Sequence, residues 1–115
     1  MKKIETVNLD TSSGSYTNAL KQIEYAIASA SVRGVDVLKF SCENPVCKSF
    51  LKNMQRAIRY VKRDGKIHCF VFGDKFDSAD DTTRYILEKA EYVRQDIDLG
   101  RENGEIAIVY VKNAN

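Results

Sequence analysis

The chain of 115 residues has few of the residues that mark specialised sites: one histidine, one proline and three cysteines. A small, odd number of cysteines fits reduced thiols better than a disulfide framework, which favours the cytoplasm. No apolar run approaches the roughly 18 residues of a membrane span, and the first ten residues lack the apolar core of a signal peptide. We therefore expect a cytoplasmic protein that has no membrane partner.

The scarcity of histidine also limits metal and nucleophile chemistry. A zinc site would need Cys42, Cys47, Cys69 and His68, but the last two are adjacent in an expected strand and so point to opposite faces of it. We expect no metal and no cofactor. Cys42 precedes an expected helix, where a thiol can become a nucleophile, but the only histidine available as its base is His68. The alternative is that the cysteines are small packing residues.

Hydrophobic periodicity divides the chain into alternating strands and helices. Short apolar or alternating runs predict strands at 4–9, 35–40, 67–72 and 105–111. Apolar positions at three- and four-residue steps predict helices at 16–32, at 46–63, and from a cap at Asp77 or Ser78 to about Val93. The order β-α-β-α-β-α-β predicts one α/β domain over residues 1–115. We expect a two- or three-layer sandwich on a four-stranded, mainly parallel or mixed sheet, in which the last strand could be antiparallel.

Local signals support the expected helix ends. Ser15 is placed to cap the first helix with its hydroxyl, and Gly34 to end it in a left-handed conformation. Four acids lie at the start of the third helix: Asp74, Asp77, Asp80 and Asp81. They fit helix capping and compensation of the helix dipole, and the alternative is a divalent metal site for hydrolysis.

Charge is distributed unevenly along the chain. Residues 46–66 carry seven basic residues and one acidic residue, whereas residues 73–105 carry ten acids and five bases. In the second helix the basic residues recur at helical spacing and line one face: Lys48, Lys52, Arg56, Arg59, Lys62 and Arg63. Such a face fits contact with nucleic-acid phosphates, and Tyr60 beside it could stack on a base. The alternative is an ordinary solvated helix surface.

Two stretches of the sequence resemble a known family. The layout from Val7-Asn8-Leu9-Asp10 through the first helix to residues 33–40 is similar to that of the Smr (small MutS-related) domain. Residues 70–111 resemble a bacterial subgroup of that family, most specifically in the D-x-D-L-G-R-x-N element at 96–103. The resemblance implies a compact α/β sandwich that binds DNA or RNA and, in some members, cleaves it as an endonuclease. Within the element, Asp96, Asp98 and Arg101 fit either a structural turn network or a partner site.

The chain departs from the family at its histidine-glycine motifs. Where members have D-L-H-G, this chain has Asn8-Leu9-Asp10-Thr11, and where they have H-G-x-G it has Cys42-Glu43-Asn44-Pro45. A glycine-rich loop lets backbone N–H groups approach a phosphate at a helix N-terminus. Pro45 lacks an N–H and Glu43 adds negative charge, and only Lys48 offers compensation. The loop therefore resembles a degenerate site.

These observations lead to three hypotheses of function. The first is a non-catalytic, Smr-like accessory domain that binds RNA or DNA through the basic face of the second helix. The second is a metal-dependent, structure-selective endonuclease with Asp10 or Cys42 as the candidate catalytic residue. The third is a protein-interaction module without affinity for nucleic acid. The missing family motif residues favour a domain that is not an enzyme.

Overall fold

A four-stranded mixed sheet forms the centre of the molecule. The computed structural model describes residues 2–12, 14–42 and 48–111, with the side chain of Lys48 outside the description. The strands are β1 (Glu5–Asn8), β2 (Val37–Ser41), β3 (Cys69–Phe72) and β4 (Ile106–Tyr110). The helices are α1 (Tyr16–Arg33), α2 (Lys48–Arg63) and α3 (Asp81–Lys89), with 3-10 helices η1 (Gly73–Lys75) and η2 (Glu91–Gln95). The predicted strands are all present: β1, β3 and β4 are shorter than expected by one or two residues at one or both ends, whereas β2 begins two residues later and ends one residue later than expected.

The strand order in the sheet is β1-β2-β4-β3. β1 and β2 pair in parallel, whereas β4 is antiparallel to both of its neighbours, β2 and β3. Two of the three pairings are antiparallel, so of the two expected alternatives the mixed sheet is confirmed and the mainly parallel one was wrong, and the last strand is antiparallel. Because β1, β2 and β3 run in the same direction, their carboxyl ends share one edge of the sheet.

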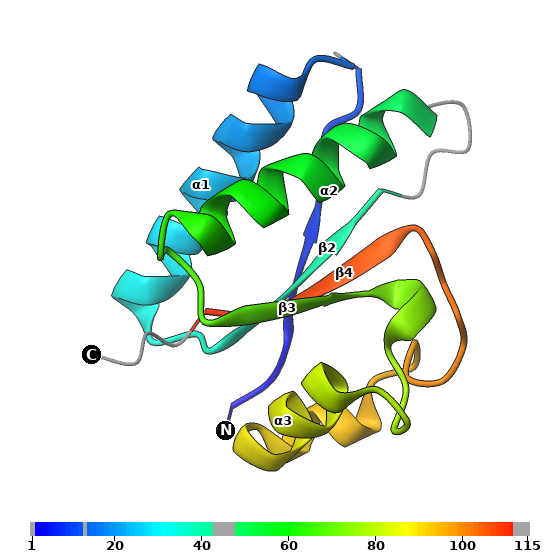
Figure 1. Cartoon of the computed structure of the whole chain (residues 1–115). Coiled ribbons are helices and arrows are strands. Elements are labelled where there is room, and N and C mark those ends of the chain that lie inside the picture. Colours follow the sequence, from blue (N-terminus) through cyan, green and yellow to red (C-terminus); the bar gives the residue numbers. More distant parts are fainter. Residues whose placement is uncertain (1, 13, 43–47, 112–115) are drawn as a thin grey trace.

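Helices cover both faces of the sheet (Figure 1). On one face, α1 and α2 pack on a cluster that includes Ile23, Phe40, Met54 and Val109. On the other face, α3 and η2 pack on a second cluster, which includes Val37, Ile86, Val93 and Ile108. Every residue of β2 and β4 is buried because side chains on both faces of these central strands are covered.

The two predicted signals at the ends of α1 are confirmed. The Ser15 Oγ accepts a hydrogen bond from the Asn18 N–H at 3.1 Å, as an N-cap does. Gly34 ends the helix at φ 73°, and its N–H donates to the carbonyl of Ala30. No helix of the described part of the chain is both long enough and apolar enough to span a membrane.

The third helix differs from the prediction at both ends. Asp80 is its N-cap, with its carboxylate 2.9 Å from the Thr83 N–H, so the expected cap at Asp77 or Ser78 was wrong. The Asp77 carboxylate instead accepts from the Ala79 N–H in the preceding turn. The helix stops at Lys89 because Ala90 leaves helical geometry at φ −136° and ψ 79°. Val93, the predicted end, lies in η2 and still packs in the core.

Candidate nucleic-acid interface on helix α2

The basic face of α2 is exposed. Five of the six predicted residues are exposed, namely Lys52, Arg56, Arg59, Lys62 and Arg63, whereas the side chain of Lys48 lies outside the description. The opposite side of the helix is fully buried at Phe50, Met54 and Val61. No acidic residue occurs between Lys48 and Arg63. We call these five exposed cations the α2 basic face.

Two arginines of this face lie over aromatic rings from neighbouring elements. The guanidinium carbon of Arg56 is 4.4 Å from the centre of the Tyr16 ring, at the start of α1. That of Arg59 is 5.0 Å from the centre of the Phe72 ring, at the end of β3. Arg56 thus contacts α1 and Arg59 contacts β3, and α2 packs against both of these elements.

The carboxyl edge of the sheet brings together the two weak catalytic candidates. The Leu9 N–H donates to the Ser41 carbonyl at 3.0 Å, so Asp10 and Cys42 leave neighbouring strands at the same edge. Cys42 is 2% exposed, and its N–H donates to the Glu105 carbonyl at 2.9 Å. Residues 43–47 of the loop lie outside the description. The Cys42 thiol is thus enclosed by the core.

Asp10 has a structural role at this edge. One carboxylate oxygen accepts from the Ser12 N–H at 3.0 Å, which closes a turn and holds the pKa of Asp10 below its ordinary value. Its backbone N–H and carbonyl bind the side-chain amide of Gln22 at 2.8 and 2.9 Å. The loop after it also contacts α2, because the Asn53 amide donates to the Gly14 carbonyl at 2.7 Å.

Three other polar candidates, His68, Cys69 and Asp81, line one pocket of about 240 Å³ together with Thr82 and Tyr85. His68 stacks on Tyr85, with ring centres 5.2 Å apart, and burial raises the pKa of Cys69 to about 11, so that thiol is protonated at neutral pH. Asp81 forms an ion pair with Arg84 within α3. Across residues 2–12, 14–42 and 48–111, no group of three histidine, cysteine or acidic side chains is placed to hold a metal ion.

The D-x-D-L-G-R-x-N element surrounds a buried lysine that the sequence prediction overlooked. Lys39, in the centre of β2, has a side chain only 8% exposed, and its ammonium lies 2.8 Å from Asp96 and 2.6 Å from Asp98. Burial lowers the pKa of Lys39, but hydrogen bonds and charge from both carboxylates outweigh it and raise the pKa overall. Burial raises the pKa of Asp98, but the hydrogen bonds and charge of Lys39 and a hydrogen bond from Asn103 outweigh it and lower the pKa overall.

The same element is fixed against η1. The Asn103 amide donates to Asp98 at 3.1 Å, and its oxygen accepts from the Glu105 N–H at 3.0 Å. The Asn103 carbonyl lies against the α-carbon of Gly73, where a Cβ atom would overlap with it. These contacts favour the structural reading of Asp96 and Asp98 over the partner-site alternative.

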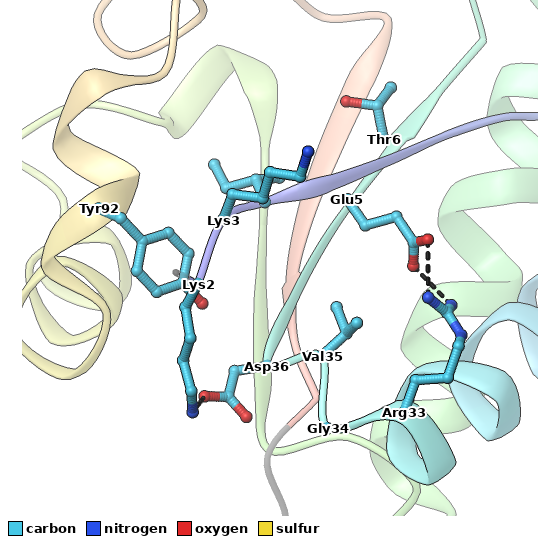
Figure 2. Close-up of a pocket in the computed structure, with 10 residues that line it drawn as sticks. Lys2, Lys3, Glu5, Thr6, Arg33, Gly34, Val35, Asp36 and Tyr92 are labelled. Atoms are coloured by element: carbon cyan, nitrogen blue, oxygen red, sulfur yellow. Dashed lines mark hydrogen bonds and ion pairs between the residues drawn. The ribbon is translucent and has the colours of Figure 1, made fainter.

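A cavity of about 600 Å³ opens at the other edge of the sheet, beside the amino ends of β1 and β2 (Figure 2). Four of its five charged residues pair with one another: Lys2 with Asp36 at 2.6 Å, and Arg33 with Glu5 through two hydrogen bonds of 2.9 and 2.7 Å. The Tyr92 hydroxyl is buried with no hydrogen-bond partner in the described part of the chain. With both acids already neutralised by bases, and Lys3 as a single further cation, the lining selects no class of ligand.

The fold and this surface define an α/β domain with a mixed sheet and an exposed cationic helix. No protein-family model matches the chain, and no curated protein matches it. Among solved structures, the Smr domain of Thermus thermophilus MutS2 is similar, with a TM-score of 0.55 and 15% sequence identity over 94% of this chain and 98% of that one. The chain therefore has an Smr-like fold, as the sequence resemblance implied.

Proposed function

We propose that this protein is a non-catalytic, Smr-like domain that binds nucleic acid through the α2 basic face. The observation that carries the proposal is the exposure of five cations on one acid-free helix face. The residues from Lys52 to Arg63 span about 16 Å of helix, a length comparable to about five phosphates along one strand. The Smr-like fold supports the proposal, because the family's members commonly bind DNA or RNA.

The candidate catalytic residues favour a domain without nuclease chemistry. The Asp10 carboxylate is engaged in its own turn, and the Cys42 thiol is enclosed by the core. Neither residue has a histidine beside it in the sequence, and the family's histidine-glycine motifs are missing. The α2 basic face supplies charge for binding phosphates without supplying a group that could cleave them.

The direct test is fluorescence anisotropy with labelled RNA and DNA oligonucleotides, single- and double-stranded, at 50 and 200 mM salt. Three to five phosphate contacts would give a slope of log affinity against log salt of about −2 to −4.5, since each contributes about 0.7 to 0.9. Affinity should then fall about 20- to 500-fold between the two salt concentrations. Replacing Arg56→Glu and Arg59→Glu together should abolish binding at 200 mM salt.

The matched control is Lys75→Glu with Arg94→Glu, which changes net charge equally. Both residues are exposed, in η1 and η2, away from α2. If this control weakened binding as much as the α2 variant, net charge rather than the α2 basic face would be responsible. An absence of binding at 50 mM salt would refute the proposal and favour the protein-interaction module, and metal-dependent cleavage would favour the endonuclease.

A further inference from the structure

The arginine contacts on α2 bear on the kind of nucleic acid that the domain would bind. Arg56 and Arg59 each lie over a half-buried ring, Tyr16 and Phe72 respectively, at 4.4 and 5.0 Å. The Arg56 guanidinium also lies 3.4 Å from the Asn53 side-chain oxygen. Such contacts restrict side chains that would otherwise move freely on a helix surface, so less conformational entropy is lost when a ligand binds.

Each of these guanidinium groups is both held on one side and open to solvent. Arg56 and Arg59 are exposed residues, so the rings beneath them do not enclose them. Guanidinium planes and aromatic rings are the surfaces on which proteins stack unpaired bases. In a duplex the bases are already stacked and paired inside the helix, and only phosphates and groove edges are presented to such a surface.

Other cations of the α2 basic face lie close enough to Arg56 and Arg59 to contact the phosphates of the same strand. Arg56 and Arg59 are three positions apart, which places their Cβ atoms about 5–6 Å from each other on one helix face, while their guanidinium groups reach out to the Tyr16 and Phe72 rings. Lys52 and Arg63 extend the same exposed face at both ends. Tyr60, four positions after Arg56, is 39% exposed and adds a ring beside it. Groups that stack and groups that neutralise charge are therefore interleaved, as in single-strand binders.

We infer that the α2 basic face binds single-stranded nucleic acid in preference to duplex, with unpaired bases stacked on the outer sides of the Arg56 and Arg59 guanidinium groups. The inference rests on the proposed function and adds a ligand class to it. Each arginine would contribute to affinity in two ways: through its charge, which lysine would retain, and through its planar surface, which lysine lacks.

The experiment uses the full chain and three probes of about twelve nucleotides: a single strand, its duplex, and an abasic strand with the same phosphates. The wild type should bind the single strand at least tenfold more tightly than the abasic strand, a modest fraction of what base stacking contributes in other proteins. Replacing Arg56→Lys and Arg59→Lys together should remove that tenfold preference. Affinity for duplex and abasic strand, and the salt slope, should stay within about twofold.

The matched control is Arg63→Lys, a conservative change on the same face. In the described part of the structure no aromatic ring lies under Arg63, so this variant should keep the preference for the strand that carries bases. Thermal melting would establish that both variants are folded. If wild type bound all three probes equally, or if the double lysine variant kept the preference, the inference would be overturned while the proposed function stood. If wild type bound none of the probes, both would be overturned.

Discussion

Replacing Lys39→Met should destabilise the fold more than any other change of a single charge. The ammonium lies between Asp96 and Asp98 with only 8% of the side chain exposed, and methionine fills a similar volume without charge. Loss of the lysine would leave two carboxylates close together with no cation between them. Those carboxylates are 12% and 17% exposed, so water would reach them only in part.

The size of the effect follows from that burial. Removing one partner of a buried ion pair costs about 3–5 kcal/mol, and partial hydration of the carboxylates places this case near the lower end. A loss of about 3 kcal/mol would lower the melting temperature of a domain of this size by about 10–15 °C. Urea unfolding followed by circular dichroism at pH 7 measures the difference directly.

Lys66→Met is the matched control. Lys66 also contacts two carboxylates, Glu24 at 2.5 Å and Asp64 at 3.4 Å, but its side chain is 42% exposed. Since solvent screens such a pair, this substitution should leave the urea midpoint nearly unchanged. Equal destabilisation by the two substitutions, or a change below about 1 kcal/mol for Lys39→Met, would refute the assignment of a stabilising buried ion cluster.

The effect of Lys39→Met should also depend on pH. The folded-state pKa of Asp98 lies below its ordinary value of 3.8, so the cluster stabilises fully above that value and loses its contribution as pH falls through the lower pKa. The folded-state pKa of Lys39 lies above 10.5, so its contribution is present below that value and is lost as pH rises through the higher pKa. The difference between wild type and variant should be greatest from neutral pH to about pH 9 and shrink on either side, and on the acidic side the shrinkage should begin early because the unpaired carboxylates of the variant take up protons at higher pH.

Substitutions at three further positions test a close contact, a helix cap and a backbone angle, each by its effect on the free energy of unfolding. Gly73→Ala should destabilise by about 3 kcal/mol or more, because the new Cβ would overlap with the Asn103 carbonyl; tolerance of alanine would show that this close approach is not maintained. Ser15→Ala should cost about 1 kcal/mol through loss of the cap on α1, and Ser15→Asp should retain the stability of wild type. Glu102→Gly should be neutral or stabilise by up to about 1 kcal/mol, because residue 102 adopts φ 54°; Glu102→Val at this position should destabilise.

The sequence predicted those features that depend on local pattern. The α2 basic face followed from the helical spacing of its lysines and arginines, and its exposure from the apolar residues opposite them, such as Phe50 and Met54. The ends of α1 followed from Ser15 and Gly34. The mixed sheet was among the expected alternatives because the order of strands and helices did not determine the direction of the last strand.

Features that depend on distant contacts could not be predicted from local pattern. Lys39 is the one charged position in β2, and its partners lie almost sixty residues further along the chain. The arginine contacts required the positions of Tyr16 and Phe72 relative to α2, which the helix pattern does not contain. The helical spacing of apolar residues continues past Ala90, although the backbone leaves helical geometry there. A prediction from periodicity alone therefore placed the end of α3 too late.

The position of β4 has a consequence for how the chain folds. β4 is the last of the described elements, but it lies inside the sheet and is the only hydrogen-bonded neighbour of β3 there. β3 therefore has no strand to pair with until Ile106–Tyr110 has been synthesised and docked. Pairing Val37 with Tyr110 closes a long loop of the chain. The conformational entropy of that loop is lost before the contacts of β4 can compensate for it. During synthesis, the first three strands should remain an incomplete sheet, and the final strand should join the two sides in one late, cooperative step.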